Sequence, residues 1–195
     1  MAKLLDEVQA PAQMVKRRIT ADEYERMGEA GIFPPDDRLE LLEGGIYETS
    51  PIGSPHAACV DALVLLFSEI AQRRFIVRVQ NPIRLSDFSE PQPDVALLRW
   101  RDDFYRSAHP TPADVLLVVE VADTTVETDR EVKVPLYART GIPEVWLVNI
   151  PDGRIEAYSD QSGDSYRRVE HFGRGASARS HTVEGLAVEV AEVLG

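Results

Sequence analysis

One apolar run of this chain reads Val115-Leu116-Leu117-Val118-Val119-Glu120-Val121. Because polar and apolar residues do not alternate in it, the run is typical of a strand that is buried on both faces of a sheet. Thr128 and Glu131 form a capping box, which predicts a helix that Gly141 would end. Residues 144–150 predict a second apolar strand. This order of strand, helix and strand favours a right-handed crossover with its two strands parallel in one sheet.

Further segments surround this unit. Capping signals and apolar periodicity predict helices at 20–30 and 54–71. Short apolar or alternating runs predict strands at 38–43, 46–50, 75–79, 83–85, 95–98, 154–159 and 166–172. Residues 186–194 fit a strand or a helix, and Pro135 implies a kink or a late start of the crossover helix. We therefore expect an α/β fold with helices on the sheet faces and with a helix and hairpin at its N-terminal end.

The bulk properties limit the class of protein. The 195 residues fit one domain, expected at 19–195 after a flexible extension at 1–18. The formal net charge of −12 argues against a general nucleic-acid coat, because such proteins gather Lys and Arg. Cys59 is the single cysteine, which excludes a disulfide framework and a thiolate zinc cluster and favours a reducing, cytoplasmic location. We expect that no stretch approaches the roughly 18 apolar residues of a membrane span, and therefore no membrane partner.

Two acids stand at the ends of apolar runs, Glu120 within 115–121 and Asp94 just before 95–98. A lone charge in such a place is expensive, and a hard divalent cation such as Mg²⁺ would offset the cost if the two strands are neighbours. Lys133 is the only lysine after residue 16, and from the crossover helix it could orient a water or stabilise charge on a phosphate. The alternative reading is a structural ion pair at a strand end.

Six blocks follow one another along the chain: Leu39-Glu40-Leu41-Leu42-Glu43-Gly44, Ser54-Pro55-His56, Gln92-Pro93-Asp94-Val95-Ala96, Leu117-Val118-Val119-Glu120-Val121, Asp129-Arg130-Glu131-Val132-Lys133, and Tyr137-Ala138-Arg139-Thr140-Gly141-Ile142-Pro143-Glu144-Val145-Trp146. Together they resemble the Uma-two family of restriction endonucleases, within the PD-(D/E)XK nuclease superfamily. The likeness runs from about residue 18 to 194. The resemblance implies a restriction-endonuclease-like fold, with a mixed central β-sheet flanked by helices.

The resemblance also implies an activity and a set of site residues. The activity is hydrolysis of phosphodiester bonds in DNA with Mg²⁺, or alternatively Mn²⁺. Asp94 and Glu120 would be metal ligands, assisted by the Val121 carbonyl, and Glu40 would be the amino-terminal acid near the site. The superfamily pattern has a lysine two residues after the second acid, where this chain has Ala122. Lys133 matches the relocated lysine of the family.

Other residues are weaker candidates. His56 and Gln92 are supporting residues. The alternative readings are a local hydrogen bond for the helix-start imidazole of His56 and ordering of its own loop by Gln92. Arg99, Arg101 and Arg106 could contact backbone phosphates or form a solvated loop.

Three functions can be compared. The first is a metal-dependent endonuclease acting on DNA, with RNA left open, and a homodimer would suit it because cutting a duplex usually takes two sites. The second is a catalytically silent module of the same fold that binds protein or nucleic acid, which the acidic charge and the displaced lysine favour. Glycoside hydrolysis by paired carboxylates ranks far behind, since it gives Lys133 no role.

Overall fold

The computed structural model describes residues 15–34, 36–49 and 51–195. Most of the extension expected at 1–18 therefore lies outside the described residues. The fold is centred on a six-stranded sheet with the strand order β3-β4-β5-β6-β7-β8. Its strands are β3 (Phe75–Val79), β4 (Val95–Arg99), β5 (Val115–Ala122), β6 (Glu144–Asn149), β7 (Arg154–Ser162) and β8 (Ser165–Gly173). Only the pair β5 and β6 is parallel, so the sheet is mixed and the predicted fold class is confirmed.

The connection from β5 to β6 is the predicted helical crossover. It consists of α3 (Val126–Thr128), a π-helical turn, η2 (Asp129–Lys133), and α4 (Val134–Thr140), and it ends at Gly141 with a left-handed φ of 89°. The wide turn lies just before Pro135, which has no N–H to donate to the carbonyl four residues earlier. The irregularity that Pro135 predicts is therefore present as a π turn at the start of the helix.

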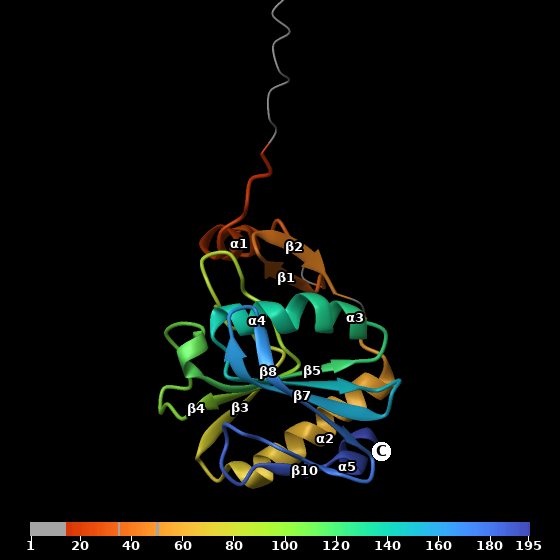
Figure 1. Ribbon diagram of the computed structural model, residues 1–195. Helices are drawn as coiled ribbons and strands as arrows, with labels where there is room; N and C mark the ends of the chain where they lie inside the picture. Colours follow the sequence, from red (N-terminus) through yellow and green to blue (C-terminus); the bar gives the residue numbers. More distant parts are fainter. Residues whose placement is uncertain (1–14, 35, 50) are drawn as a thin grey trace, which may run out of the picture.

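Helices cover both faces of the sheet (Figure 1). α2 (Ser54–Ala71) and the short α5 (Val190–Leu194) lie on one face, where Leu63 and Phe67 pack in a cluster with Trp146. α4 lies on the other face, where Leu136 and Tyr137 join a second buried cluster. The sheet is therefore the middle of three layers, and both of its faces are buried as the apolar run at 115–121 predicted.

The length and composition of α2 alone would allow it to cross a membrane. The expectation that no stretch approaches a membrane span is wrong in this respect. However, the buried residues of α2, Cys59, Val60, Leu63 and Phe67, pack in the cluster beneath the sheet. Val64, Leu66 and Ile70 are partly buried against the same cluster, which is the arrangement of a core helix, whereas Leu65 is exposed.

A small N-terminal lobe stands on the α4 side of the sheet (Figure 1). It consists of α1 (Ala21–Glu29) and a hairpin of β1 (Leu39–Leu42) and β2 (Gly45–Glu48). The capping box between Thr20 and Glu23 is formed as the sequence predicted. Backbone hydrogen bonds from the lobe to residues 87–90, including Glu90 N–H to the Leu41 carbonyl at 2.7 Å, attach it to the loop that leads into β4.

Three details of the secondary structure differ from the sequence predictions. The capping box predicted at Thr128 and Glu131 is not formed, because Thr128 is itself helical and makes no side-chain capping hydrogen bond, and the helical segment begins at Val126. Residues 83–85 are not a strand: Ile83 and Leu85 are buried, and their N–H groups bond to the carbonyls of Pro91 and Ser89 within the same loop. Their apolar character reflects burial of a loop rather than strand pairing. The C-terminal segment forms both alternatives, β10 (Ala187–Glu189) followed by α5, and β10 pairs with an unpredicted strand, β9 (Ser177–Arg179). The remaining short element is a 3₁₀ turn, η1 (Pro112–Asp114).

Glu156 on β7 anchors the crossover helix to the sheet. Its carboxylate, which is 1% exposed, accepts hydrogen bonds from Arg130 of η2 at 2.7 and 3.1 Å and from Tyr158 at 2.7 Å. Burial alone would raise the pKa of Glu156, but the hydrogen bonds from Arg130, Asn149, Tyr158 and Arg154 outweigh it and lower the pKa to about 2.

The low pKa of Glu156 predicts a loss of stability in acid. A carboxyl that falls from its ordinary pKa of 4.5 to about 2 on folding stabilises the fold above pH 4.5 by about 3 kcal/mol, and this is lost as the pH falls through 2. Urea unfolding of Glu156→Gln at pH 7 should therefore show about that deficit, and a smaller further loss at pH 3 than the wild type. The exposed Glu189→Gln on β10 is the matched control. Equal acid sensitivity of Glu156→Gln and wild type would contradict this role.

Candidate active site

Asp94, which directly precedes β4, lies opposite Glu120 of β5. The register of β4 and β5 pairs Val95 with Val119, so the next step along the ladder brings Asp94 across from Glu120. Asp94 lies two positions from Ala96, and Glu120 lies two positions from Val118, and both apolar residues belong to the cluster under α4. Because every second residue of a strand faces the same side, both acids face the crossover helix. The adjacency that the metal hypothesis required is therefore present.

Asp94 is held as a carboxylate by three donors. Oδ2 accepts hydrogen bonds from Val121 N–H at 2.9 Å and from His56 Nε2 at 3.1 Å, and Oδ1 accepts one from Gln80 Nε2 at 3.2 Å. Burial raises the pKa of Asp94, but His56, Val121 and Gln80 together outweigh burial and leave the pKa below its usual value. The same hydrogen bond raises the pKa of His56. His56 thus contacts the predicted metal ligand itself, and Val121 contributes its N–H here, while the role predicted for its carbonyl stays a prediction.

Lys133 reaches the acids from the crossover helix. Its Nζ lies 3.0 Å from Oε2 of Glu40, 3.3 Å from Oε1 of Glu120 and 3.9 Å from Oδ1 of Asp129. Burial lowers the pKa of Lys133, but the charges of Glu120, Glu40 and Asp129 outweigh burial and raise it above its ordinary value. The lysine is therefore an ammonium ion at neutral pH, buried at the centre of the acidic group.

Glu120 is the acid whose charge is least favoured. It is 3% exposed, and burial raises its pKa well above the ordinary value; the neighbouring Asp129, Asp94 and Glu40 add to this against the opposing charge of Lys133. Tyr137 donates its hydroxyl to Oε1 of Glu120 at 2.5 Å. Burial likewise raises the pKa of Asp129. The set therefore carries more negative charge than Lys133 can offset.

Glu40 enters from the N-terminal hairpin. Its Oε1 accepts the backbone N–H of Gln92 at 2.8 Å, while the Gln92 side chain donates to the Leu39 carbonyl at 3.2 Å. Gln92 therefore joins the hairpin to the loop before β4 and fixes Glu40 in position. This agrees with the reading of Gln92 as a residue that orders its loop.

Three members of the site were not predicted as such: Gln80, Asp129 and Tyr137. Asp129 and Tyr137 lie four residues before and after Lys133, a spacing that places all three on one face of a helix and was available in the sequence. Gln80 has a left-handed φ of 47° at the end of β3, and no sequence pattern identifies it. Its contact with Asp94 arises from the pairing of β3 with β4.

The arginines proposed for phosphate contact lie elsewhere. Asp94 precedes β4 and Arg99 ends it, so Arg99 is at the opposite end of the strand, where it donates to the Ala113 carbonyl. Arg101 pairs with Asp103 two residues away. The solvated-loop reading of this segment is the one that the structure supports.

The site suits a hard divalent cation. Four carboxylates, Asp94, Glu120, Glu40 and Asp129, surround one ammonium and one imidazole. Both Glu120 contacts given above fall on Oε1, which leaves Oε2 for a ligand. Mg²⁺ usually takes one or two carboxylates and keeps several waters, so Asp94 and Glu120 are a sufficient set. A cation there would offset the surplus charge that raises the pKa of Glu120.

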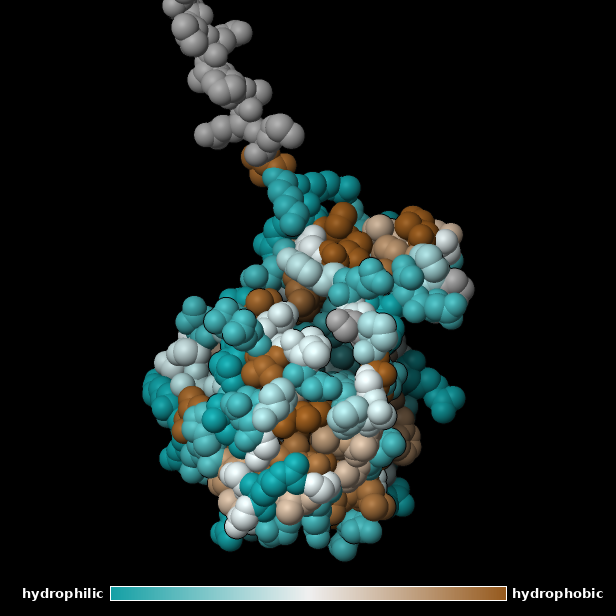
Figure 2. All heavy atoms as spheres, turned by 90° about the vertical axis from the view of Figure 1, so that its right-hand side faces the viewer, coloured by the Kyte–Doolittle hydropathy of each residue, from teal (hydrophilic) through white to brown (hydrophobic). Residues whose placement is uncertain are grey.

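The surface beside the site is concave. Figure 1 places the C-terminal end of β5 and α3 on the same side of the molecule, below the N-terminal hairpin. Viewed from that side, the molecule is hollowed between the N-terminal lobe and the main body (Figure 2). Glu120 on β5 and Glu40 on the hairpin therefore belong to the two parts that border this hollow.

Comparisons with known proteins agree with this architecture. No curated protein matches the sequence. A crystal structure from Anabaena variabilis, described as a putative nuclease of a family of unknown function, DUF820, superposes with a TM-score of 0.65 at 15% identity, over 90% of this chain and 97% of that one. Residues 21–191 match the family model Uma2, described as "putative restriction endonuclease". The fold is thus shared with that nuclease-like structure, and the chain belongs to the Uma2 family.

Proposed function

We propose that this protein is a metal-dependent endonuclease that hydrolyses phosphodiester bonds in DNA, with Asp94 and Glu120 binding Mg²⁺ or Mn²⁺. The observation that carries the proposal is the burial of Lys133 within 3.3 Å of both Glu40 and Glu120, on the sheet face to which Asp94 also belongs. Family membership and the shared fold support a nuclease-like function. We further propose that the chain is of the PD-(D/E)XK type, with Asp94 and Glu120 as its two acids, and that it is cytoplasmic.

Each residue has a distinct task in this scheme. The metal, when bound, would polarise the phosphate and lower the pKa of a water. Asp94 stays ionised because His56, Val121 and Gln80 donate to it, so it is ready to bind a cation without losing a proton. Lys133 would stabilise the negative charge that develops on the phosphate, and Glu40 holds its ammonium in place. Tyr137 fixes the rotamer of Glu120.

The test is cleavage of supercoiled plasmid DNA by the full chain with Mg²⁺, Mn²⁺ or EDTA. We expect cleavage with either metal, none with EDTA, and loss of cleavage in Asp94→Ala. Glu131→Gln is the control, because Glu131 lies in the same turn as Asp129 and Lys133 but is exposed. The same assay with single-stranded RNA shows whether the protein cleaves RNA as well as DNA. Equal product from wild type and Asp94→Ala would end the proposal.

The second candidate is a catalytically silent module of the same fold that binds protein or nucleic acid. Lys133 is already engaged in three ion pairs, and the chain carries a net charge of −12, which both favour this reading. It predicts that the protein has no Mg²⁺ site that depends on Glu120, so calorimetric titration with Mg²⁺ should give the same result for wild type and Glu120→Ala. Binding of one Mg²⁺ per chain that this variant abolishes would contradict it.

We also propose a homodimer, since one site cuts one strand. Light scattering of the purified chain gives the mass directly. A dimer that linearises plasmid without accumulating nicked circles would support paired sites, and a monomer that only nicks would contradict them.

Tyr137 provides a test of the scheme through metal affinity. Tyr137→Phe removes only the hydroxyl that orients Glu120, so the affinity for Mg²⁺ should fall by about 10–100-fold, as for other residues that orient metal ligands. Calorimetric titration measures it. Tyr166→Phe is the matched control, because Tyr166 is also buried but donates to the Ile142 carbonyl. Equal Mg²⁺ affinity in both variants would show that Tyr137 only packs.

A further inference from the structure

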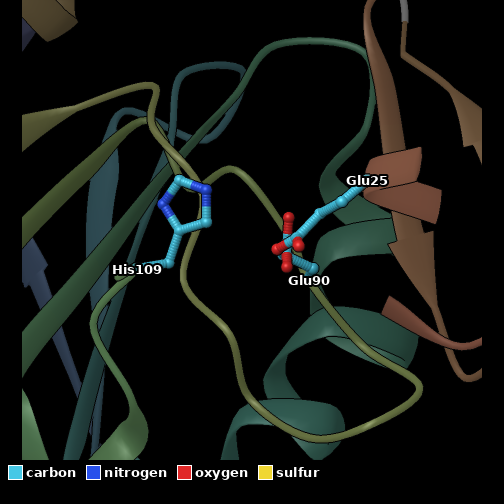
Figure 3. Close-up of side chains that lie close together, drawn as sticks. All are labelled: Glu25, Glu90 and His109. Atoms are coloured by element: carbon cyan, nitrogen blue, oxygen red, sulfur yellow. The ribbon is translucent and has the colours of Figure 1, made fainter. Parts of the chain in front are cut away.

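A second group of potential ligands lies in the N-terminal lobe and the loops beside it. Glu25 comes from α1, Glu90 from the loop before β4, and His109 from the segment before η1. One ligand atom from each lies within 4.8 Å of the other two, and Figure 3 shows the two carboxylates meeting, with the His109 ring turned toward them. Among residues 15–34, 36–49 and 51–195, this is the one group in which three such side chains come so close.

Glu90 is the residue that points to a ligand. It is 2% exposed, and its Oε2 is buried with no hydrogen-bond partner in the described part of the chain. Its backbone is fixed, because its N–H donates to Leu41. A buried carboxylate oxygen without a partner is costly, so its retention calls for a proton or a cation in front of it.

The neighbouring charges do not fill this place. Arg84 lies 3.5 Å from Oε1 of Glu25 and also pairs with Asp22, so it holds the outer side of the group. Burial, followed by the charge of Glu25, raises the pKa of Glu90 to about 7 in spite of Arg84. Two carboxyl groups therefore face each other with too little positive charge between them.

His109 is suited to bind a metal. Burial and then the charge of Arg78 lower its pKa, so the imidazole is neutral at pH 7. Arg78 Nη2 lies 3.3 Å from Nδ1, and since a guanidinium can only donate, Nδ1 accepts and Nε2 carries the proton. A cation can bind Nε2 only if that proton moves to Nδ1. The hydrogen bond from Arg78 to Nδ1 is then lost.

We propose that Glu25, Glu90 and His109 form a second metal site, distinct from Asp94 and Glu120, for one divalent cation of the class of Zn²⁺. An imidazole among carboxylates favours Zn²⁺ and similar ions over Mg²⁺, which prefers oxygen ligands alone. Bonds of about 2.0–2.2 Å would draw the three ligand atoms closer than they now lie, and half-buried Glu25 on α1 can make that movement. The cation would link α1 to the loops before β4 and η1.

The test is titration of the full chain with Zn²⁺ in excess Mg²⁺, which occupies the site at Asp94 and Glu120. We expect one Zn²⁺ per chain by calorimetry, a rise in Tm of about 5 °C or more at saturation, and visible absorption bands when Co²⁺ is the probe. Glu90→Gln and His109→Gln should each weaken Zn²⁺ binding by at least about 100-fold and remove the Co²⁺ bands.

Matched variants make the outcome decisive. Glu29→Gln on α1 and His171→Gln on β8 change exposed residues of the same types and should bind Zn²⁺ as the wild type does. Asp94→Asn should also retain Zn²⁺ binding. Circular dichroism and Tm without metal show that each variant is folded, and Glu90→Gln should lose no stability because it removes an unpartnered charge. Zn²⁺ binding that survives both Glu90→Gln and His109→Gln, or that Asp94→Asn abolishes, would overturn the site.

Discussion

Replacement of Lys133 by methionine is expected to lower the rate of Mg²⁺-dependent DNA cleavage by about 10²–10³-fold, the usual cost of removing one group that stabilises charge in a transition state. Methionine keeps the length and most of the volume of the side chain but has no charge. The ammonium lies between Glu40 and Glu120, so no other described cation can replace it at that place. Cleavage of plasmid by wild type and variant under identical Mg²⁺ measures the difference.

The same substitution should also affect stability. Removing one member of a buried ion pair typically costs about 3–5 kcal/mol because the partners are left charged and unpaired. Here three acids lose their cation, and protons can replace it, so the loss should be larger at pH 8 than at pH 5. Mg²⁺ should restore part of the lost stability, since it supplies positive charge to the same acids.

Two further variants separate catalysis from folding. Lys133→Arg keeps the charge but replaces a compact ammonium with a planar guanidinium, so the variant should fold and still cleave slowly. Lys16→Met makes the same change at an exposed lysine and should have no effect. If Lys133→Met lowers Tm yet cleaves as fast per folded molecule as wild type, Lys133 is a structural partner of Glu40 and nothing more.

The parts of the fold that the sequence predicts are those specified locally. The run at 115–121, the cap at Thr20 and Glu23, and Gly141 each fix an element through its own neighbours, and all are present. Residues 83–85 mislead because burial of a loop and burial of a strand require the same apolar residues. The strand β9 was missed because its three residues carry little pattern.

The sequence identifies most residues of the site, but it does not show which of them contact one another. Asp94 and Glu120 are marked by apolar runs, whereas the meeting of Lys133 with Glu40 joins residues 93 positions apart and depends on how the hairpin sits over the helix. Asp129 and Lys133 are buried while Glu131 and Val132 are exposed, as the four-residue spacing along a helix allows. That spacing does not show which residues the buried side meets, so only the structure brings Lys133 to the acids.

The second large effect is expected from Glu120→Gln, which should abolish Mg²⁺ binding yet leave the metal-free protein more stable at pH 8. Glutamine keeps an oxygen that can accept the Tyr137 hydroxyl, and Lys133 retains Glu40 and Asp129. What disappears is a buried negative charge that the other acids oppose. The affinity for Mg²⁺ should fall by at least about 100-fold, because a ligand is lost rather than merely reoriented.

The raised pKa of Glu120 also predicts how the stability of wild type and Glu120→Gln changes with pH. The folded pKa of Glu120 lies above its unfolded value near 4.5, so the wild type without metal should lose stability as the pH rises from 4.5 toward the folded pKa. Glu120→Gln removes this contribution and keeps those of Asp129 and Glu90, whose pKa values are also raised and which are unchanged between the two proteins. Urea unfolding at pH 5 and pH 8, with EDTA or Mg²⁺, separates the two proteins, with exposed Glu127→Gln as the control.

Mg²⁺ should stabilise the wild type and Glu127→Gln but not Glu120→Gln. A structural ion pair predicts the reverse, a loss of stability in Glu120→Gln at every pH and no response to Mg²⁺ in any variant, because then the charge of Glu120 would serve Lys133 alone.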